Sequence, residues 1–506
     1  MKYFTVHPYY LKHETLHIPE FHCENPETAE QLEYAYRKAL DTVFNINCVY
    51  EKPFALAPSE MMNASPLDAP VLCAGSSYNN VWNRDGSYEV IMAVALMAPR
   101  IAESNLRLLV ADNGIINASV WEKTFTEMQY WDRVIWIIAA QRLYSVYHNK
   151  KFLDYAVEVG CRSFEWQEEH YFNAEFGLFT GPAFFHDPIC AWPREFTVDF
   201  DPDNDFVGHY PEVLKNMTLS TNCIYYGAWR ALADLLDEVE GGREKAECCR
   251  RKAELLKENI RRHFFRPDAP FPAYFVRGVE KDYGKPEFYQ EASGLGFALM
   301  FDIPDQKQKE SIFRNVHLEP NGIPNVWPNF WNDLNGRGRG QTHGGYLTPT
   351  NVVIHPQSNG LWAVGCARNG QTELLQSEIE NMFRLVKENR SCCEIYHARS
   401  GDPSLCGTIE VKKDQCWGAT AVLGSIIYGV FGIQYTADSM VFQPALPGEW
   451  GALSLLGVAY GDALFDVELR GAGACIDRFE YDGVAQEKPE VRFGTQGRHR
   501  IVITMK

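Results

Sequence analysis

The sequence predicts a mainly helical fold, a toroid of six helical hairpins, followed by a small all-β domain. Apolar side chains recur at helical spacing from about residue 25 to 430, and several of these helical stretches are separated by short turns. Near residue 436 the pattern changes to the alternation that is typical of strands. With 506 residues, 46% of them hydrophobic and 13% aromatic, the chain is long enough for one large core and one small core.

The first helix has a clear start signal. Asn25 is a good N-cap, Pro26 suits the first helical position, and Glu27 places an acid in the first turn. Residues 1–24 form an N-terminal extension that we expect to add a strand or two. Further helices are predicted near 85–98, 100–111, 125–147, 150–169, 220–238, 243–264, 287–301, 305–315, 356–368, 370–388 and 414–430.

Short turns join several of these helices into antiparallel hairpins: 125–147 with 150–169, 220–238 with 243–264, and 356–368 with 370–388. Between the hairpins the chain makes long aromatic and Gly/Pro-rich excursions at 170–219, 265–286 and 316–355. Loops of this length are normally functional. A six-hairpin toroid over 25–435, with its long loops gathered at one end, accounts for both observations.

The last part of the chain has strand character. Ala463–Leu469 and Ile501–Ile503 alternate apolar and polar side chains or are rich in β-branched residues, and turns such as Asp482-Gly483 separate the runs. We therefore predict a β-sandwich-like domain over 436–506.

Charge and composition exclude several classes of function. The net charge of −18 argues against a nucleic-acid partner, which requires basic surface. No run of about 18 apolar residues is present, so we expect no membrane partner. The N-terminus has no apolar signal region, and the 14 Cys are scattered without a Cys-x-x-Cys motif. We expect reduced thiols and a cytoplasmic location.

Two segments place carboxylates beside aromatic rings at predicted helix starts. In the first, Arg84 and Asp85 are suited to grip sugar hydroxyls and Trp82 to stack on a sugar ring; the alternative is that Asp85 only caps the helix. In the second, Trp131 and Asp132 have the same character, and Asp132 is equally suited to be a cap. Flat rings and carboxylates together favour a carbohydrate-active enzyme.

Asp187 is the preferred candidate for a general acid. It follows Phe184-Phe185-His186, and apolar neighbours raise a carboxyl pKa so that the group stays protonated. The alternative is an Asp-Pro turn, and Glu195, Asp199 and Glu291 are rival acids. The acidic run from Asp199 to Asp205 has oxygen ligands for Ca²⁺ but lacks the full EF-hand loop, so a solvated turn is favoured and we expect no metal.

Glu394 is the preferred candidate for a general base. It precedes a Gly-Asp-Pro turn and the segment that contains Trp417, and a base that activates water belongs in such a polar position; Glu410 is the rival. His355 and Gln357 begin another predicted helix and suit substrate hydrogen bonds, although His355 could be only a cap. Aromatic and His side chains suited to wall a subsite, or to pack in a loop, occur at Trp327, Phe330, Trp331 and His343.

Several enzyme classes lack their motifs in this chain. The sequence has no Gly-x-Ser-x-Gly elbow, no P-loop, no Gly-x-Gly-x-x-Gly after a strand and no His-Glu-x-x-His. A serine hydrolase, a nucleotide enzyme and a zinc enzyme are therefore disfavoured, and we expect no cofactor.

These segments resemble the six-hairpin, (α/α)6-barrel glycosidases, and most of all glycoside hydrolase family 63 with its mannosylglycerate-hydrolase-like relatives. In these families a Glu-x-Tyr element near a Gly precedes a Trp-(Ser/Gly)-Ala helix and carries the general base, as Glu394 to Tyr396 and Trp417 to Ala419 do here. The Trp-x-Arg-Asp element at Trp82–Asp85 resembles the segment that holds the sugar. The β tail from Phe442 to Trp450 resembles the C-terminal domain of bacterial rhamnosidases and disaccharide phosphorylases.

One departure concerns the acid. The families carry it in a Ser-Gly-x-Asp loop, whereas this chain has Thr180-Gly181-Pro182 and its carboxylate comes only at Asp187. The resemblance implies an inverting, exo-acting α-glycosidase with 25–435 as its catalytic domain, Asp187 as acid and Glu394 as base, acting on an oligosaccharide or small glycoside. An α-glucoside is the first guess, with mannoside or rhamnoside as alternatives.

Two other classes of function stay open; a sugar epimerase on the same toroid is a weaker alternative, because it would normally use paired His and the His here are dispersed. A disaccharide phosphorylase would need a cationic loop such as Arg337–His343 to hold phosphate. The other is an inactive carbohydrate-binding protein. The sequence leaves the linkage, the sugar and the oligomeric state undetermined.

Overall fold

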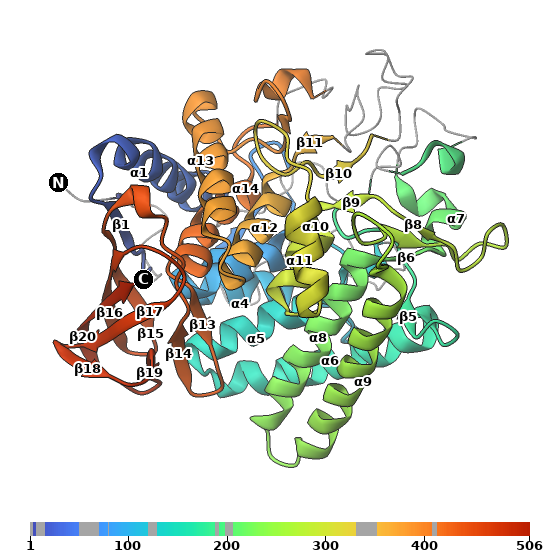
Figure 1. The fold of residues 1–506 in the computed structure, drawn as a ribbon. Helices are drawn as coiled ribbons and strands as arrows, with labels where there is room; N and C mark the ends of the chain where they lie inside the picture. The colour runs from blue at the N-terminus through green and yellow to red at the C-terminus, as the bar shows by residue number, and fades with distance from the viewer. Residues whose placement is uncertain are drawn as a thin grey trace.

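The computed structural model describes residues 4–6, 16–49, 70–78, 80–119, 129–187, 192–197, 206–329, 352–406 and 412–506. These residues form a large helical region and a separate β-rich region that contains the C-terminus (Figure 1). Within the described ranges, no helix combines the length and the apolar character needed to cross a membrane. The cysteines in these ranges carry free thiols.

Six helices contact one another in a closed cycle. Each contacts the next, and α14 contacts α2 again. In chain order they are α2 (Asn83–Glu89), α5 (Ile135–Tyr147), α8 (Leu219–Asp237), α10 (Ala292–Met300), α12 (Pro356–Arg368) and α14 (Cys416–Gly424). We call these the inner helices. Every residue of α2, α10 and α14 is buried, as expected for helices that are enclosed on all sides.

A second set of helices alternates with the inner helices along the chain: α1 (Pro26–Asp41), α4 (Pro99–Leu108), α6 (Lys150–Tyr171), α9 (Arg243–Phe264), α11 (Gln306–Asn315) and α13 (Thr372–Asn389). These helices bury one face only; in α9 the buried residues recur at helical spacing from Ala246 to Phe264. The three predicted hairpins are confirmed, because α5 contacts α6, α8 contacts α9 and α12 contacts α13.

Local sequence signals explain several helix starts. The side chain of Asn25 accepts a hydrogen bond from the backbone N–H of Glu27 at 3.0 Å, and Pro26 stands at the first helical position, as predicted. Asp305 and Gln308 form a capping box at the start of α11.

Several predicted helices differ from the structure in their bounds or their type. The stretch predicted at 85–98 is α2, a π-helical segment η2 (Val90–Val94) and the short α3 (Ala95–Met97). The stretch predicted at 287–301 becomes helical only at Ala292, because β9 (Gln290–Glu291) pairs with β10 (Val326–Trp327). Apolar spacing alone does not reveal such a pairing.

Short strand ladders stand at the N-terminal ends of the inner helices. Strand β6 (Met217–Thr218) leads directly into α8, β9 leads into α10, and β11 (Val353–Ile354) ends just before α12. Their partners lie far along the chain: β7 (Phe275–Val276) with β8 (Pro286–Glu287) for β6, β10 for β9, and β12 (Tyr396–His397) for β11. Two more ladders pair β2 (Cys48–Val49) with β3 (Val71–Leu72) and β4 (Phe172–Asn173) with β5 (Leu178–Phe179).

The β-rich region holds two sheets. The larger has the order β1-β15-β16-β20-β17-β18, and its first strand comes from the N-terminal extension. Its strands are β1 (Glu20–Cys23), β15 (Leu453–Tyr460), β16 (Ala463–Gly471), β20 (Gly497–Met505), β17 (Ile476–Tyr481) and β18 (Val484–Gln486). The smaller sheet joins β13 (Ile433–Tyr435), β14 (Ser439–Phe442) and β19 (Glu490–Arg492). Strand β13 contacts α5 and the π-helical η8 (Ser425–Val430), so this region adjoins the C-terminal ends of inner helices.

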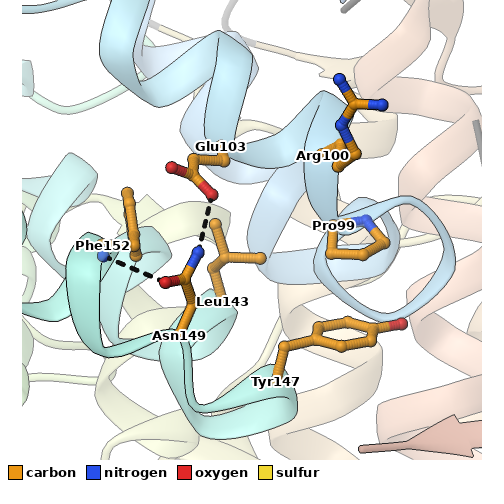
Figure 2. A pocket seen from close by; sticks show the side chains of 7 residues that line it. All are labelled: Pro99, Arg100, Glu103, Leu143, Tyr147, Asn149 and Phe152. Carbon is orange, nitrogen blue, oxygen red and sulfur yellow. Dashed lines mark hydrogen bonds between the residues drawn. The ribbon is translucent and has the colours of Figure 1, made fainter. Parts of the chain in front are cut away.

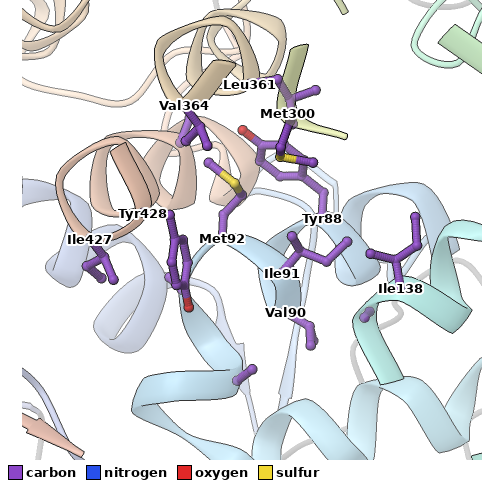
Figure 3. Packing of buried hydrophobic residues seen from close by; sticks show 14 of the residues in the cluster. Tyr88, Val90, Ile91, Met92, Ile138, Met300, Leu361, Val364, Ile427 and Tyr428 are labelled. Carbon is purple, nitrogen blue, oxygen red and sulfur yellow. The ribbon is translucent and has the colours of Figure 1, made fainter. Parts of the chain in front are cut away.

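An apolar core fills the middle of the helical cycle. Side chains from α2, η2, α5, α10, α12 and η8 meet there, among them Tyr88, Met92, Ile138, Leu361 and Val364 (Figure 3). The hydroxyl of Tyr88 donates to the backbone carbonyl of Gln357 at 3.0 Å. This bond joins α2 to α12, the two helices that flank α14 in the cycle.

Replacing Gly360 with Ala is expected to destabilise the protein by about 1–3 kcal/mol, because a Cβ at this position overpacks the core. It would lie 2.7 Å from the Tyr88 hydroxyl and 2.8 Å from the Cβ of Ala421. Gly429→Ala is the matched control, since its nearest neighbour would be 3.7 Å away. Chemical denaturation of both variants checks the prediction, which is wrong if both lose the same stability.

Candidate active site

The predicted substrate-binding residues lie at the N-terminal ends of the inner helices, whereas Asp187 and Glu394 lie in loops. Trp82 is the N-cap position of α2, and Trp131 and Asp132 belong to a 3-10 turn (Tyr130–Asp132) before α5. His355 and Gln357 begin α12, and Trp417 is in the first turn of α14. Because these helices adjoin in the cycle, their starts face a common region.

Arg84 lies close to carboxylates from three segments. Its Nε lies 3.6 Å from Asp85 Oδ2, its Nη1 lies 3.6 Å from Asp132 Oδ2, and its Nη2 lies 3.5 Å from Asp187 Oδ2. These are ion-pair contacts that are longer than good hydrogen bonds. The Arg84 guanidinium therefore lies within ion-pair distance of all three carboxylates.

Two of these carboxylates are buried and titrate near neutral pH. Burial, with a further contribution from the charge of Asp187, raises the pKa of Asp85 to about 6, against the effect of Arg84. Burial also raises the pKa of Asp132 to about 7, although Arg84 and Arg133 favour its charged form. Asp132 is consequently partly protonated at neutral pH, and Asp85 becomes so slightly below it.

The structure excludes the capping alternatives for three residues. Asp85 lies inside α2, after the N-cap Trp82, and Asp132 precedes Val134, which is the N-cap of α5. His355 does occupy the N-cap position of α12, but its side chain makes no capping hydrogen bond. Burial lowers the pKa of His355 to about 3, so its ring is neutral.

Asp132→Asn is expected to stabilise the folded protein more at pH 8 than at pH 5. The pKa of Asp132 is raised on folding, so unfolding relieves the cost of the buried charge, and this cost grows as the pH rises to about 7. Thermal unfolding at the two pH values checks the prediction. Asp477→Asn, which removes an exposed carboxylate 2.8 Å from Lys506, should show no such gain, and an equal gain at both pH values would contradict the argument.

Glu394 is held by a tyrosine that the sequence analysis did not single out. The Tyr78 hydroxyl donates to Glu394 Oε1 at 3.2 Å and lies 3.4 Å from Oε2, and Glu394 is only 4% exposed. The Tyr78 ring packs edge-on against Trp82 with centroids 5.7 Å apart. Burial raises the pKa of Tyr78, and the negative charges of Glu394, Asp187 and Asp85 add to the effect. Tyr78 therefore lies near both proposed catalytic carboxylates and links Glu394 to the Arg84 segment.

Aromatic side chains line the same region. The His355 ring lies 4.9 Å from Trp417 and 6.0 Å from Phe185, to which it is nearly parallel. Phe185 was expected only as an apolar neighbour of Asp187. Its ring also packs against Tyr88 of the core, with ring centroids 6.0 Å apart. On the other side, Trp131 stacks on Phe206 with centroids 6.2 Å apart. The site thus has flat apolar faces beside its carboxylates.

The segment that carries Asp187 is firmly anchored. The backbone carbonyl of Asp187 accepts a hydrogen bond from Val207 N at 2.7 Å. The preceding His186 ring contacts the Tyr274 hydroxyl at 2.6 Å, and the indole N–H of Trp192 donates to the His186 carbonyl. The Asp187 side chain remains 32% exposed, which leaves it accessible to a substrate.

The two rival acids that the structure describes, Glu195 and Glu291, interact with residues outside the Arg84 group. Glu195 is 41% exposed and forms an ion pair with Arg277, which also contacts Glu287 at 2.7 Å. Glu291 is buried and accepts hydrogen bonds from Ser220 N at 3.2 Å and from the Ser293 hydroxyl at 2.8 Å. Burial raises the pKa of Glu291 to about 7, but both of its oxygens are engaged in joining α8 to α10.

Other predicted candidates lie outside the described residues: the rival acid Asp199 with its acidic run to Asp205, the rival base Glu410, Phe330, Trp331 and the loop Arg337–His343. Trp327 is described, and its ring stacks on His317 at 3.8 Å. In the part of the chain that the structure describes, no three His, Cys, Asp or Glu side chains are grouped so as to hold a metal ion.

A pocket of about 210 Å³ lies away from these residues, between α4, the C-terminal end of α5 and the start of α6 (Figure 2). The Asn149 side chain crosses it: its Nδ2 donates to Glu103 Oε2 at 3.2 Å, and its Oδ1 accepts from Phe152 N at 3.4 Å. Both polar groups of Asn149 are thus engaged, Oδ1 in capping α6 and Nδ2 by Glu103.

Comparison with known proteins identifies the fold. No family model and no curated protein matches the sequence. Among solved structures, a sialidase superposes with a TM-score of 0.63 at 14% identity over 88% of this chain and 37% of its own. A GH78 rhamnosidase from a Bacillus species gives 0.60 at 14% identity, over 97% and 44%. A GH63 mannosylglycerate hydrolase from Thermus thermophilus gives 0.55 at 13% identity, over 77% and 99%.

The chain has a glycosidase-like fold. It spans less than half the length of the sialidase and of the GH78 rhamnosidase, but nearly all of the GH63 structure. These likenesses, with identities of 13–14%, concern the fold and leave activity and substrate to be argued from the site.

Proposed function

We propose that this protein is a glycoside hydrolase that acts on the terminal α-linked sugar of a small glycoside or oligosaccharide with inversion. The observation that carries the proposal is a concentration of buried polar atoms that lack hydrogen-bond partners among the described residues. They are Asp85 Oδ2, both oxygens of Asp132, His355 Nδ1, the indole N–H of Trp131 and Trp417, and both amide atoms of Gln357 and Gln415.

Such atoms are rare in folded proteins, and here donors and acceptors occur together beside aromatic rings. A sugar hydroxyl both donates and accepts a hydrogen bond, and the apolar face of a sugar ring stacks on Trp. A polyhydroxylated ligand would satisfy this set of groups, whereas an apolar ligand would leave them all unpaired.

The roles follow from the surroundings of each carboxylate. Asp187, at the accessible edge of the Arg84 group, would protonate the leaving glycosidic oxygen. Glu394, oriented by Tyr78, would deprotonate the attacking water. Inversion requires about 6.5–9.5 Å between these two carboxyl groups. Trp82, Arg84, Asp85 and Asp132 would hold the sugar ring.

The fold supports an exo-acting mode. We infer that the cycle of inner helices and the second set of helices form an (α/α)6 toroid over 25–435, with the β domain over 436–506. The apolar core adjoins the site, because Tyr88 of the core packs against Phe185. A substrate would therefore enter at the end of the toroid where the long loops lie, with one terminus first. Only its terminal sugar would reach Glu394.

Hydrolysis of aryl α-glucosides, α-mannosides and α-rhamnosides, with and without phosphate, tests the proposal. We expect phosphate-independent release of one sugar, with the glucoside as the first choice. Turnover that requires phosphate would contradict hydrolysis and indicate a phosphorylase. Saturable sugar binding without turnover under either condition would indicate a carbohydrate-binding protein.

A further inference from the structure

Gln415 stands at the N-cap position of α14, with none of its surface exposed. Its side chain makes no capping hydrogen bond, and neither Oε1 nor Nε2 bonds to any described residue. Buried polar groups in folded proteins are nearly always paired, because an unpaired donor or acceptor loses its hydrogen bonds to water without replacement. An amide with both groups unpaired therefore points to a ligand that completes it.

The backbone holds Gln415 between the two segments that carry Glu394 and its tyrosine partner. The Gln415 N–H donates to the Cys392 carbonyl at 2.8 Å, two residues before Glu394. On its other side Gln415 forms an antiparallel bridge with Gly75, whose carbonyl accepts a hydrogen bond from Tyr78 N at 2.9 Å. Because the Tyr78 hydroxyl donates to Glu394, these contacts place Gln415 beside the candidate base.

Gly75 leaves the space that the Gln415 amide occupies. A Cβ at Gly75 would lie 2.6 Å from Cδ of Gln415 and 2.9 Å from Nε2, closer than Cβ contacts in proteins. The φ of Gly75 lies outside the left-handed region, so a larger residue here would displace the amide rather than strain the backbone. The contact with Gly75 fixes where the amide lies, although it supplies no hydrogen bond.

We propose that Gln415 is a specificity-determining residue that reads adjacent hydroxyls of the terminal sugar, an inference that rests on the proposed glycosidase function. Oε1 accepts a hydrogen bond from one hydroxyl and Nε2 donates to its neighbour, since a hydroxyl serves in either role. Deoxygenation at either position leaves one amide atom buried and unpaired, which weakens binding. The amide thus selects the sugar, whereas Glu394 acts on water.

The sugar-free protein supplies a first test, because an unpaired buried amide destabilises it. Gln415→Leu has a side chain of similar size without polar groups, so the Tm should stay the same or rise. Gln290→Leu is the matched control: Gln290 is equally buried, but its Nε2 donates to the His317 carbonyl at 3.0 Å and its Oε1 accepts from His317 N at 2.7 Å. The Tm of this control should fall. An equal fall in both variants would overturn the proposal.

The second test compares kcat/KM for the preferred aryl α-glycoside with that for each of its monodeoxy derivatives. The wild type should prefer the parent by roughly 10–100-fold at two adjacent ring positions, the effect of leaving one buried group unpaired. Gln415→Leu should lose this preference at those positions alone. Gly75→Ala, which displaces the amide, should give the same pattern. Gly429→Ala, where the nearest neighbour of the new Cβ is 3.7 Å away, should behave as the wild type.

The outcome separates the role of Gln415 from the proposed function. If the wild type binds the sugar without hydrolysis, the function is wrong, and Kd values from calorimetry on the parent and deoxy sugars then give the preferences. Preferences in Gln415→Leu that match the wild type at every ring position would overturn the role of Gln415. A uniform loss at every position would overturn it too, because the amide would then only support the fold.

Discussion

Glu394→Gln is expected to lower kcat by about 10²–10⁴-fold, the contribution of a general base, while the protein remains folded. Glutamine keeps the shape of the side chain and can still accept the Tyr78 hydrogen bond, but it cannot take a proton from water. Steady-state kinetics on the preferred aryl glycoside, together with circular dichroism, checks the result.

Glu378→Gln is the control for this substitution. Glu378 is as buried as Glu394, but it lies on α13, where it accepts hydrogen bonds from Asn359 and from the backbone N–H of Ile323. We expect it to affect stability and to leave kcat of the folded enzyme unchanged. A Glu394→Gln enzyme that retains most of its kcat would remove Glu394 from the base role.

Asp187→Asn is expected to lower kcat about 10²–10⁴-fold on disaccharides and alkyl glycosides, but far less on dinitrophenyl glycosides. A dinitrophenolate leaves without protonation, so the loss of the acid matters little for that substrate. The dependence of the defect on the leaving group separates a general acid from a residue that only binds sugar.

Glu195→Gln is the comparison for Asp187, because Glu195 was a rival acid and is engaged by Arg277. It should show an equal, small effect on both kinds of substrate. If the leaving-group dependence appears in Glu195→Gln and not in Asp187→Asn, the assignment of the acid is wrong.

The convergence of many candidate site residues was predictable because these residues mark helix starts. Arg84, Asp85 and Asp132 each stand beside or close to a Trp where a loop becomes a helix, and such local patterns can be found along a sequence. The inner helices bring their N-terminal ends together, so segments that are distant in the chain converge around Arg84. The hairpins were predictable for a similar reason, since short turns force neighbouring helices to pair.

What the sequence could not show depends on contacts between distant segments. Tyr78 lies in a loop without a motif, and only the fold places its hydroxyl against Glu394, 316 positions later. The separate N-terminus of α10 depends on β9 pairing with β10.

Proton NMR of the anomeric signals at early times of turnover tests the central claim most directly. The account predicts that the first sugar released from an α-glycoside is the β-anomer, and that the signal is lost in Glu394→Gln. First release of the α-anomer would contradict it, because retention requires a covalent intermediate on one carboxylate and a shorter carboxyl separation than the proposed water attack needs.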